Sequence, residues 1–355
     1  MHDDEQRADD RAGDDRAGDG RLDVVAVGSA IVDVLSPATD DDLERLGLVK
    51  GSMALVDLER AAAVYAQMGP ATEVSGGSAA NTAAGVAALG GRAGYIGKVA
   101  ADELGDVFLH DITAAGVVTG RVAPVAPGVA GADVDLATGR CLVLVTDDGE
   151  RTMATHLGAA STLGPDDLDE ELIARAQVVY LEGYLWDLAP AKRALRRTIE
   201  VAHAADATVA LSVSDPFCVQ RHRAEFLELL RADVDVFFAN EEEALLLFGV
   251  DRFDEALFAV EDTGLLAAIT RGAKGSVVVT ASGSLTVAAE PVDRVVDTTG
   301  AGDLYAAGFL HGLTSGCEPD ESARLAGICA AEVISHIGAR PQADLRRLAE
   351  AAGIA

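Results

Sequence analysis

The chain has 355 residues, 49% of them hydrophobic, and a formal net charge of −30. This length and apolar content allow a full hydrophobic core, which excludes a wholly disordered protein. The negative charge argues against nucleic acid or an anionic membrane as a partner, and no apolar run reaches the ~18 residues of a membrane span. Because the Asp- and Arg-rich N-terminus does not fit a secretory signal, we expect a cytoplasmic protein.

Residues 1–20 are of low complexity and repeat the polar unit DRAGD. Such a segment cannot bury enough surface to offset its ordering entropy, so we predict a disordered acidic tail. The folded domain is expected to span residues 21–355.

From Leu22 onward, short apolar runs alternate with helical segments. This alternation predicts an α/β fold with a parallel sheet covered on both faces. Strands are expected at 24–28, 93–99, 177–181, 208–213 and 234–239, with three more in 265–288. Helices are expected at 78–89, 102–115, 166–176, 189–205, 221–231, 302–315 and 319–337.

Two segments, about 34–56 and 129–157, break this alternation. The second reads as two antiparallel strands joined by an Asp148-Gly149 turn. One interpretation is that the two segments together form a small sheet that covers a substrate. The alternative is a pair of ordinary surface hairpins.

The run DTTGAGDLYAAGFLHGL, residues 297–313, is the most informative stretch. It sets the turn Gly300-Ala301-Gly302 directly before Asp303, at the start of an apolar helix. Glycines let backbone amides converge on an anion, and the helix dipole adds positive potential. A carboxylate beside an anion site is what phosphoryl transfer to an alcohol requires. The alternative is a well-capped helix without chemistry.

A second run, GGSAANTAAGVAALGG, covers residues 76–91. Gly76-Gly77 permits close backbone approach, Ser78 can cap the helix, and Asn81 lies one turn further on. A tightly packed Ala/Gly helix explains the same composition.

Asp33 follows the first strand, where ligands bind in open α/β sheets. Its carboxylate can accept hydrogen bonds from neighbouring sugar hydroxyls. An ordinary loop aspartate is the alternative.

Two further motifs follow strands in the second half of the chain. ANEEEALLLFG, residues 239–249, places Asn240 as a helix cap before three glutamates, an arrangement that helix capping alone explains. TRGAKGS, residues 270–276, is a glycine-rich loop between two strands, where a plain hairpin turn is the alternative. No GxxxxGK[ST] run is present, so a nucleotide site of the P-loop type is excluded.

The runs at 76–91 and 297–313 resemble the N-terminal and C-terminal signatures of the ribokinase, or PfkB-type, family of sugar and nucleoside kinases. They occur in the family's order, about 220 residues apart, and the resemblance extends from about Leu22 to Arg347. It implies a ribokinase-like three-layer fold with a mostly parallel central sheet and a small β lid. It also implies ATP and Mg²⁺ as cofactors, a small-molecule substrate, and either a monomer or a homodimer joined through the lid.

The resemblance assigns a role to residues of each motif. Asp303 is the expected catalytic base, with Gly300, Ala301 and Gly302 as the anion hole. The expected substrate-binding residues are Asp33, Gly76, Gly77 and Asn81, with Arg151 reaching the transferring phosphate from the lid. The expected nucleotide-binding residues are Asn240, Thr270, Gly272, Lys274 and Gly275. Glu243 is expected to organise Mg²⁺ through water, and Asp297 and Thr299 match positions that hold a monovalent cation, such as K⁺, in some relatives.

Four stretches look most like adenosine-kinase-like members: 40–57, 138–153, 180–187 and 211–217. Tyr184 and Trp186 either line a purine pocket or pack against the sheet. We therefore predict an ATP-dependent kinase of the nucleoside 5′-hydroxyl, with adenosine giving AMP. The alternatives are a ribokinase- or fructokinase-like sugar kinase and a catalytically silent nucleoside-binding protein.

Overall fold

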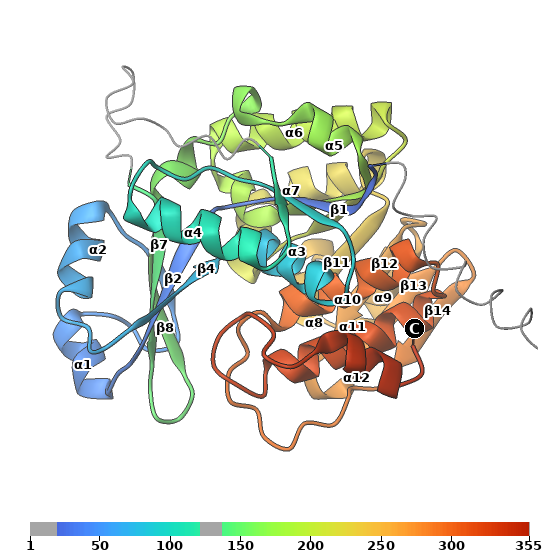
Figure 1. Ribbon diagram of the computed structural model, residues 1–355. Coiled ribbons are helices and arrows are strands. Elements are labelled where there is room, and N and C mark those ends of the chain that lie inside the picture. Colours follow the sequence, from blue (N-terminus) through green and yellow to red (C-terminus); the bar gives the residue numbers. More distant parts are fainter. Residues whose placement is uncertain (1–19, 121–136, 355) are drawn as a thin grey trace, which may run out of the picture.

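The computed structural model of the chain describes residues 20–120 and 137–354 (Figure 1). Almost all of the predicted tail, and residues 129–136 of the second predicted lid segment, lie outside the described residues. Within the described part, no helix has the length and apolar character needed to cross a membrane.

Within residues 20–120 and 137–354, a sheet of nine strands forms the centre, in the order β14-β13-β12-β11-β10-β9-β1-β5-β6. The strands from β12 to β6 are parallel, whereas β13 and β14 are antiparallel. Their bounds are β1 Leu22–Val27, β5 Ala93–Ile96, β6 Val118–Thr119, β9 Ala176–Glu182, β10 Thr208–Ser212, β11 Val236–Asn240, β12 Leu266–Thr270, β13 Ser276–Thr280 and β14 Gly283–Val287. The predicted strands are confirmed.

Helices cover both faces of this sheet (Figure 1), as expected for parallel strands that are apolar on both sides. On one face lie α5 Glu170–Ala174, α6 Ala189–Ala204, α7 Pro216–Ala232, α8 Glu241–Phe248 and α9 Phe253–Glu261. On the other lie α3 Ser78–Ala88, α4 Glu103–Ala114, α10 Ala301–Ser315, α11 Pro319–Val333 and α12 Leu345–Ala351. Each face of the sheet has its own hydrophobic core. The side chains of β1 alternate between them: Val24 and Ala26 belong to one core, and Val25 and Val27 to the other. The predicted three-layer α/β fold is confirmed.

Some helix predictions need correction. The helix predicted at 166–176 is confined to α5, and the one predicted at 221–231 begins earlier, where Asp215 caps α7 and Pro216 takes its first position. Helices α9 and α12 have no counterpart in the sequence prediction.

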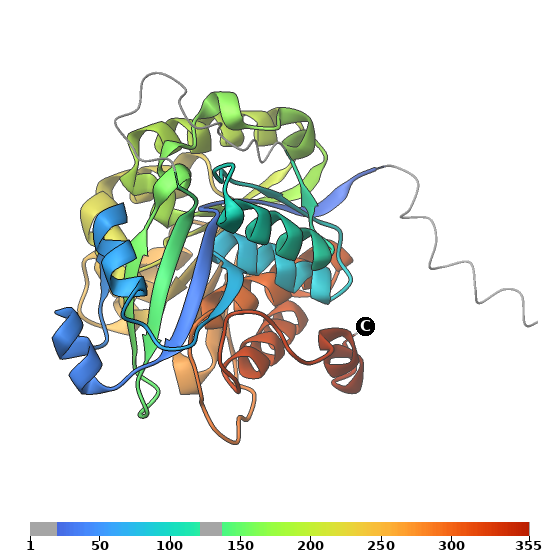
Figure 2. The same cartoon turned by 60° about the vertical axis from the view of Figure 1, so that its left-hand side comes forward.

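A second sheet, in the order β3-β8-β7-β2-β4, stands beside the first (Figure 2). Its strands are β2 Ile31–Pro37, β3 Met53–Leu55, β4 Thr72–Gly76, β7 Gly139–Val145 and β8 Arg151–His156. Helices α1 Asp40–Leu46 and α2 Leu58–Tyr65 lie on its far side (Figure 1). Strands β7 and β8 are antiparallel around the predicted turn. β4 also joins this sheet, which the sequence did not indicate.

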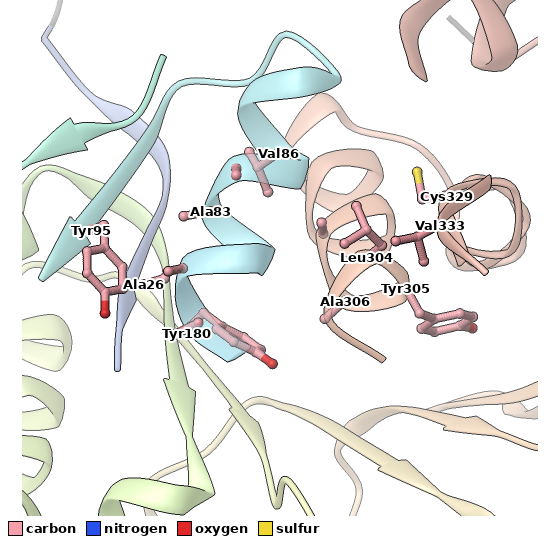
Figure 3. Close-up of a cluster of buried hydrophobic side chains, with 14 of the residues drawn as sticks. Ala26, Ala83, Val86, Tyr95, Tyr180, Leu304, Tyr305, Ala306, Cys329 and Val333 are labelled. Carbon is pink, nitrogen blue, oxygen red and sulfur yellow. The ribbon is translucent and has the colours of Figure 1, made fainter. Parts of the chain in front are cut away.

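Helices α3 and α10 pack side by side (Figure 3), and a glycine of α3 lets them approach closely. A Cβ atom placed on Gly85 would lie 2.6 Å from Ala307 Cβ and 2.8 Å from Leu304 Cδ1. On the opposite side of α10, Gly308 and Gly312 permit an equally close approach of α11. The close contact between α3 and α10 sets their N-termini next to each other, and with them the two signature runs.

Candidate active site

Asp303 lies in the first turn of α10 and receives two hydrogen bonds from α3. Ser78 Oγ donates to its Oδ1 at 2.7 Å, and Asn81 Nδ2 donates to its Oδ2 at 2.9 Å. The residue keeps partial solvent access, yet burial raises the pKa of its carboxyl, while Ser78, Asn81 and Arg340 lower it. A raised pKa suits a general base, because the carboxylate then gains more from taking a proton. Ser78 was predicted to cap α3, but Gly77 is the N-cap and the Ser78 hydroxyl turns to Asp303 instead.

The turn before Asp303 exposes backbone amides at the N-terminus of α10. Gly300 adopts φ 77°, and no side chain caps the helix. The amide of Ala301 donates to Thr298 O at 3.2 Å, so the chain itself uses part of the cradle. Gly302 is exposed, and no atom lies within 4 Å of a Cβ placed on it. The open side of the helix N-terminus is therefore suited to an anion.

The glycine pair before α3 packs against a backbone oxygen of Ser29 and the side-chain carboxyl of Asp33. A Cβ on Gly77, whose φ is 94°, would overlap the carbonyl oxygen of Ser29, and one on Gly76 would overlap the Asp33 carboxyl. Asp33 lies within strand β2, so the alternative of an ordinary loop aspartate is wrong. Burial raises its pKa to about 7, against the lowering effect of Arg340 and Arg151.

Asn81 is buried, and its Oδ1 has no hydrogen-bond partner within the described residues. A buried carbonyl oxygen without a donor costs free energy. A ligand hydroxyl would remove this cost, as expected of a substrate-binding residue.

Arg151, at the start of β8, joins the small sheet to the loop before α10. Its guanidinium contacts the Asp297 carboxylate and the Thr299 hydroxyl, and burial lowers its pKa to about 10. Asp297 also accepts from Thr299 N at 2.9 Å and from Gly338 N at 2.7 Å. A monovalent cation at Asp297 and Thr299 would have to share the carboxylate with this guanidinium. These residues therefore fit such an ion poorly in this conformation, and the K⁺ site stays a prediction.

The Asn240–Glu243 pair forms a reciprocal helix cap. Asn240 Oδ1 accepts from Glu243 N at 2.9 Å, while the Glu243 carboxylate accepts from the backbone and side-chain nitrogens of Asn240 at 2.9 and 2.7 Å. The capping alternative is thus correct for this pair. Burial raises the pKa of Glu243 to about 7, and Asp215 and Glu242 raise it further. A nearby cation would relieve this concentration of acidic groups, so the site remains compatible with water-mediated Mg²⁺.

The predicted nucleotide loop lies beside this pair, because Thr270 on β12 is in register with Asn240 on β11. Gly272 faces open space, whereas a Cβ on Gly275 would overlap Val287 O. Lys274 is exposed and pairs with Glu241 at 3.2 Å. Gly275 therefore has a packing reason of its own, and Gly272 is the glycine that leaves room for a ligand.

Tyr184 and Trp186 have different surroundings. Trp186 is buried and packs against Phe226, with ring centroids 6.0 Å apart, so packing is the correct alternative for this residue. Tyr184 is half-buried, and its pKa is raised well above the usual value by burial and by carboxylates that include Asp303. Its hydroxyl lies 3.4 Å from Ser214 O, and a role for Tyr184 in a purine pocket stays a prediction.

Sequence reasoning missed Glu182, at the end of β9. Its side chain is fully buried and accepts from Ser29 N at 2.7 Å and from Ala79 N at 2.9 Å. It thus joins the end of β1 to the first turn of α3, which lacks a side-chain cap of its own. An acidic residue at the end of an apolar strand was the available signal. A second missed residue, Arg340, is a single arginine in a loop and gives no such signal.

Glu182 makes stability depend on pH in a predictable direction. Burial raises its pKa from 4.5 to about 7, so the folded state favours the protonated form. Its contribution to the free energy of unfolding is fully present below pH 4.5 and is lost as the pH rises through 7. This contribution is at most roughly 3 kcal/mol. In thermal melts from pH 5 to pH 8, Glu182→Gln should lose stability less steeply than the wild type. Equal slopes would contradict this prediction.

The fold and this site together define a phosphotransferase of the kinase class. The sequence model of the pfkB family of carbohydrate kinases matches residues 46–345. The chain therefore belongs to the pfkB family.

Individual relatives divide between two descriptions. The crystal structure of adenosine kinase from Sinorhizobium meliloti is 48% identical, with a TM-score of 0.87, and the match covers 94% of this chain and 99% of that one. A probable sugar kinase from Rhizobium etli is 45% identical, with a TM-score of 0.88 and the same coverage. Adenosine kinase from Saccharomyces cerevisiae is 30% identical over 89% of this chain and 95% of its own length.

Proposed function

We propose that the protein transfers the γ-phosphoryl group of ATP to the 5′-hydroxyl of a nucleoside, with adenosine giving AMP. The observation that carries this proposal is the Asp303 carboxylate, held by Ser78 and Asn81 beside the uncapped N-terminus of α10. This arrangement places a base for the hydroxyl next to donors for the moving phosphoryl group.

The substrate side of the proposal uses the two carboxylates, Asn81 and the glycines of the candidate site. Asp33 accepts hydrogen bonds from the ribose hydroxyls, and the unpartnered Oδ1 of Asn81 accepts another. Gly76 and Gly77 let the sugar approach the backbone. Asp303 takes the proton of the 5′-hydroxyl as the 5′-oxygen bonds to the γ-phosphorus and ADP leaves. The amide of Gly302 stabilises the negative charge of the phosphoryl group during the transfer.

The nucleotide side of the proposal involves the neighbouring strand ends. Thr270 and Gly272 contact ATP beside Asn240, and Glu243 would hold Mg²⁺ through water. When bound, this ion supplies positive charge that neutralises the phosphates. Arg151 moves from Asp297 to the transferring phosphate when the nucleotide is present, which makes the small sheet a lid.

The preference for adenosine rests on similarity to the Sinorhizobium and yeast adenosine kinases. The alternative, phosphorylation of a free sugar, is favoured by the likeness to the Rhizobium sugar kinase. Both reactions use the same base and anion site, and they differ in what occupies the space beyond the ribose.

A coupled assay of ADP release, with a panel of acceptors offered one at a time, distinguishes these functions. The panel contains adenosine, other nucleosides, ribose and fructose. We expect kcat/KM to be highest for adenosine. A preference for a free sugar would replace the nucleoside assignment, and tight nucleoside binding without ADP release from any acceptor would indicate a silent binding protein.

A further inference from the structure

Residues 338–340, which follow α11, contact two segments of the candidate site. One is the turn before α10, and the other contains the glycine pair before α3. Gly338 N donates to Asp297 Oδ2 at 2.7 Å. Ala339 packs on the turn before α10, since a Cβ on Gly300 would lie 2.8 Å from Ala339 Cβ. Arg340 reaches the other segment, which contains Gly76-Gly77. Three consecutive residues thus join the phosphate-binding turn to the substrate-binding glycines.

The Arg340 guanidinium uses all of its nitrogens on this second segment. Nη1 donates to Ala80 O at 2.7 Å, Nη2 to Ser75 Oγ at 2.8 Å and Ser75 O at 3.0 Å, and Nε to Ser75 O at 3.2 Å. Ser75 precedes Gly76-Gly77, and Ala80 follows them in the first turn of α3. The acceptors therefore lie on both sides of the glycine pair, and a rigid fork of donors fixes its conformation.

The opposite side of Ser75 is held as well. Its backbone nitrogen donates to Asp111 Oδ2, from α4, at 2.8 Å. Ser75 is almost completely buried, so its own acceptor atoms have little access to water. The glycine pair is thus supported by a network that needs the planar guanidinium.

We propose that Arg340 is a positioning residue of the phosphoryl-transfer reaction: it holds the β4–α3 junction in place, where Gly76 packs against the Asp33 carboxyl and the first turn of α3 binds Asp303. This inference rests on the proposed function, because it assigns those two carboxylates to substrate binding and proton removal.

The positive charge of Arg340 affects the pKa values of the two carboxyl groups in a definite direction. It lowers the pKa of Asp33 and of Asp303, against the larger raising effect of burial. Asp303 in turn raises the pKa values of Asp33, Tyr180, Glu182 and Tyr184. Loss of the guanidinium charge should therefore move the acid limb of the kcat/KM profile to higher pH.

Two variants separate the two roles of Arg340. Arg340→Gln removes the charge and the fork, and should lower kcat/KM by roughly 10²-fold and shift the acid limb to higher pH. Arg340→Lys keeps the charge but not the fork, and should raise KM while the acid limb stays in place. Arg347→Gln, an exposed arginine of the same C-terminal region, is the matched control and should leave both quantities unchanged.

The measurement is kcat and KM from pH 5 to pH 9, with the acceptor on which the wild type is most active. The position of the limb does not depend on the fraction of folded enzyme, so partial misfolding does not obscure it. An unshifted limb in Arg340→Gln would overturn the electrostatic role, and an unchanged KM in Arg340→Lys would overturn the positioning role. If Arg340→Gln does not fold, Arg340→Lys alone decides the positioning role, and a wild-type KM then rejects the inference. Failure of the proposed function is seen separately, in the acceptor preference of the wild type.

Discussion

Asp303→Asn is expected to lower kcat by about 10²–10⁴-fold, the range that a general base contributes. An amide cannot accept the proton of the 5′-hydroxyl, so the acceptor oxygen would have to attack the γ-phosphorus without being activated. Nucleoside and ATP affinity should remain close to the wild-type values, because the backbone and the charged groups that bind them are unchanged. Calorimetric titration of adenosine beside a turnover assay measures both quantities.

The Asn side chain should be accommodated without disturbing the fold. Its oxygen can accept from Asn81 Nδ2, and its nitrogen can donate to Ser78 Oγ, since a hydroxyl serves as donor or acceptor. Ser78→Ala is the matched control, because it removes a hydrogen bond to the same carboxylate and keeps the base. It should cost far less turnover than Asp303→Asn. Undiminished turnover in Asp303→Asn would refute the assignment of the base.

The sequence was sufficient to predict the elements that have a regular hydrophobic pattern or a short motif. The strands of the large sheet are continuous apolar runs, and the two glycine-rich runs could be placed at helix N-termini from glycine chemistry alone. Their proximity follows from Gly85 and Ala307, which let α3 and α10 approach closely. The sequence contained these small residues but not the information that the two helices are partners.

The parts that sequence reasoning missed depend on contacts between distant segments. Arg340 binds Ser75 across 265 positions of the chain, and Glu182 binds Ala79 across 103. A single arginine or glutamate has no local pattern that reports such a partner. Strand β4 was missed for a related reason, because its sequence TEVSG is short and half polar and becomes a strand only beside β2.

Gly77→Ala is expected to damage both the fold and the activity, because two separate costs meet at this residue. Its φ of 94° is unfavourable for a residue with a Cβ. The added methyl group would also overlap the Ser29 carbonyl oxygen, and Glu182 holds the Ser29 backbone at 2.7 Å. We expect a loss of about 3 kcal/mol in the free energy of unfolding and a fall in kcat/KM of roughly 10²-fold, as the glycine pair moves relative to Asp33 and Asn81.

Gly264→Ala separates these two costs. Gly264 also has a positive φ, 73°, but no atom lies within 4 Å of a Cβ placed on it. This variant should therefore lose only the conformational cost, about 1 kcal/mol, and keep the wild-type kcat/KM. Thermal melts and steady-state kinetics of the two variants, measured side by side, give the comparison. Of the two glycines, only Gly77 meets a fixed carbonyl oxygen. If both variants lost the same stability and neither lost activity, the contact with Ser29 would therefore not be what holds the glycine pair in place.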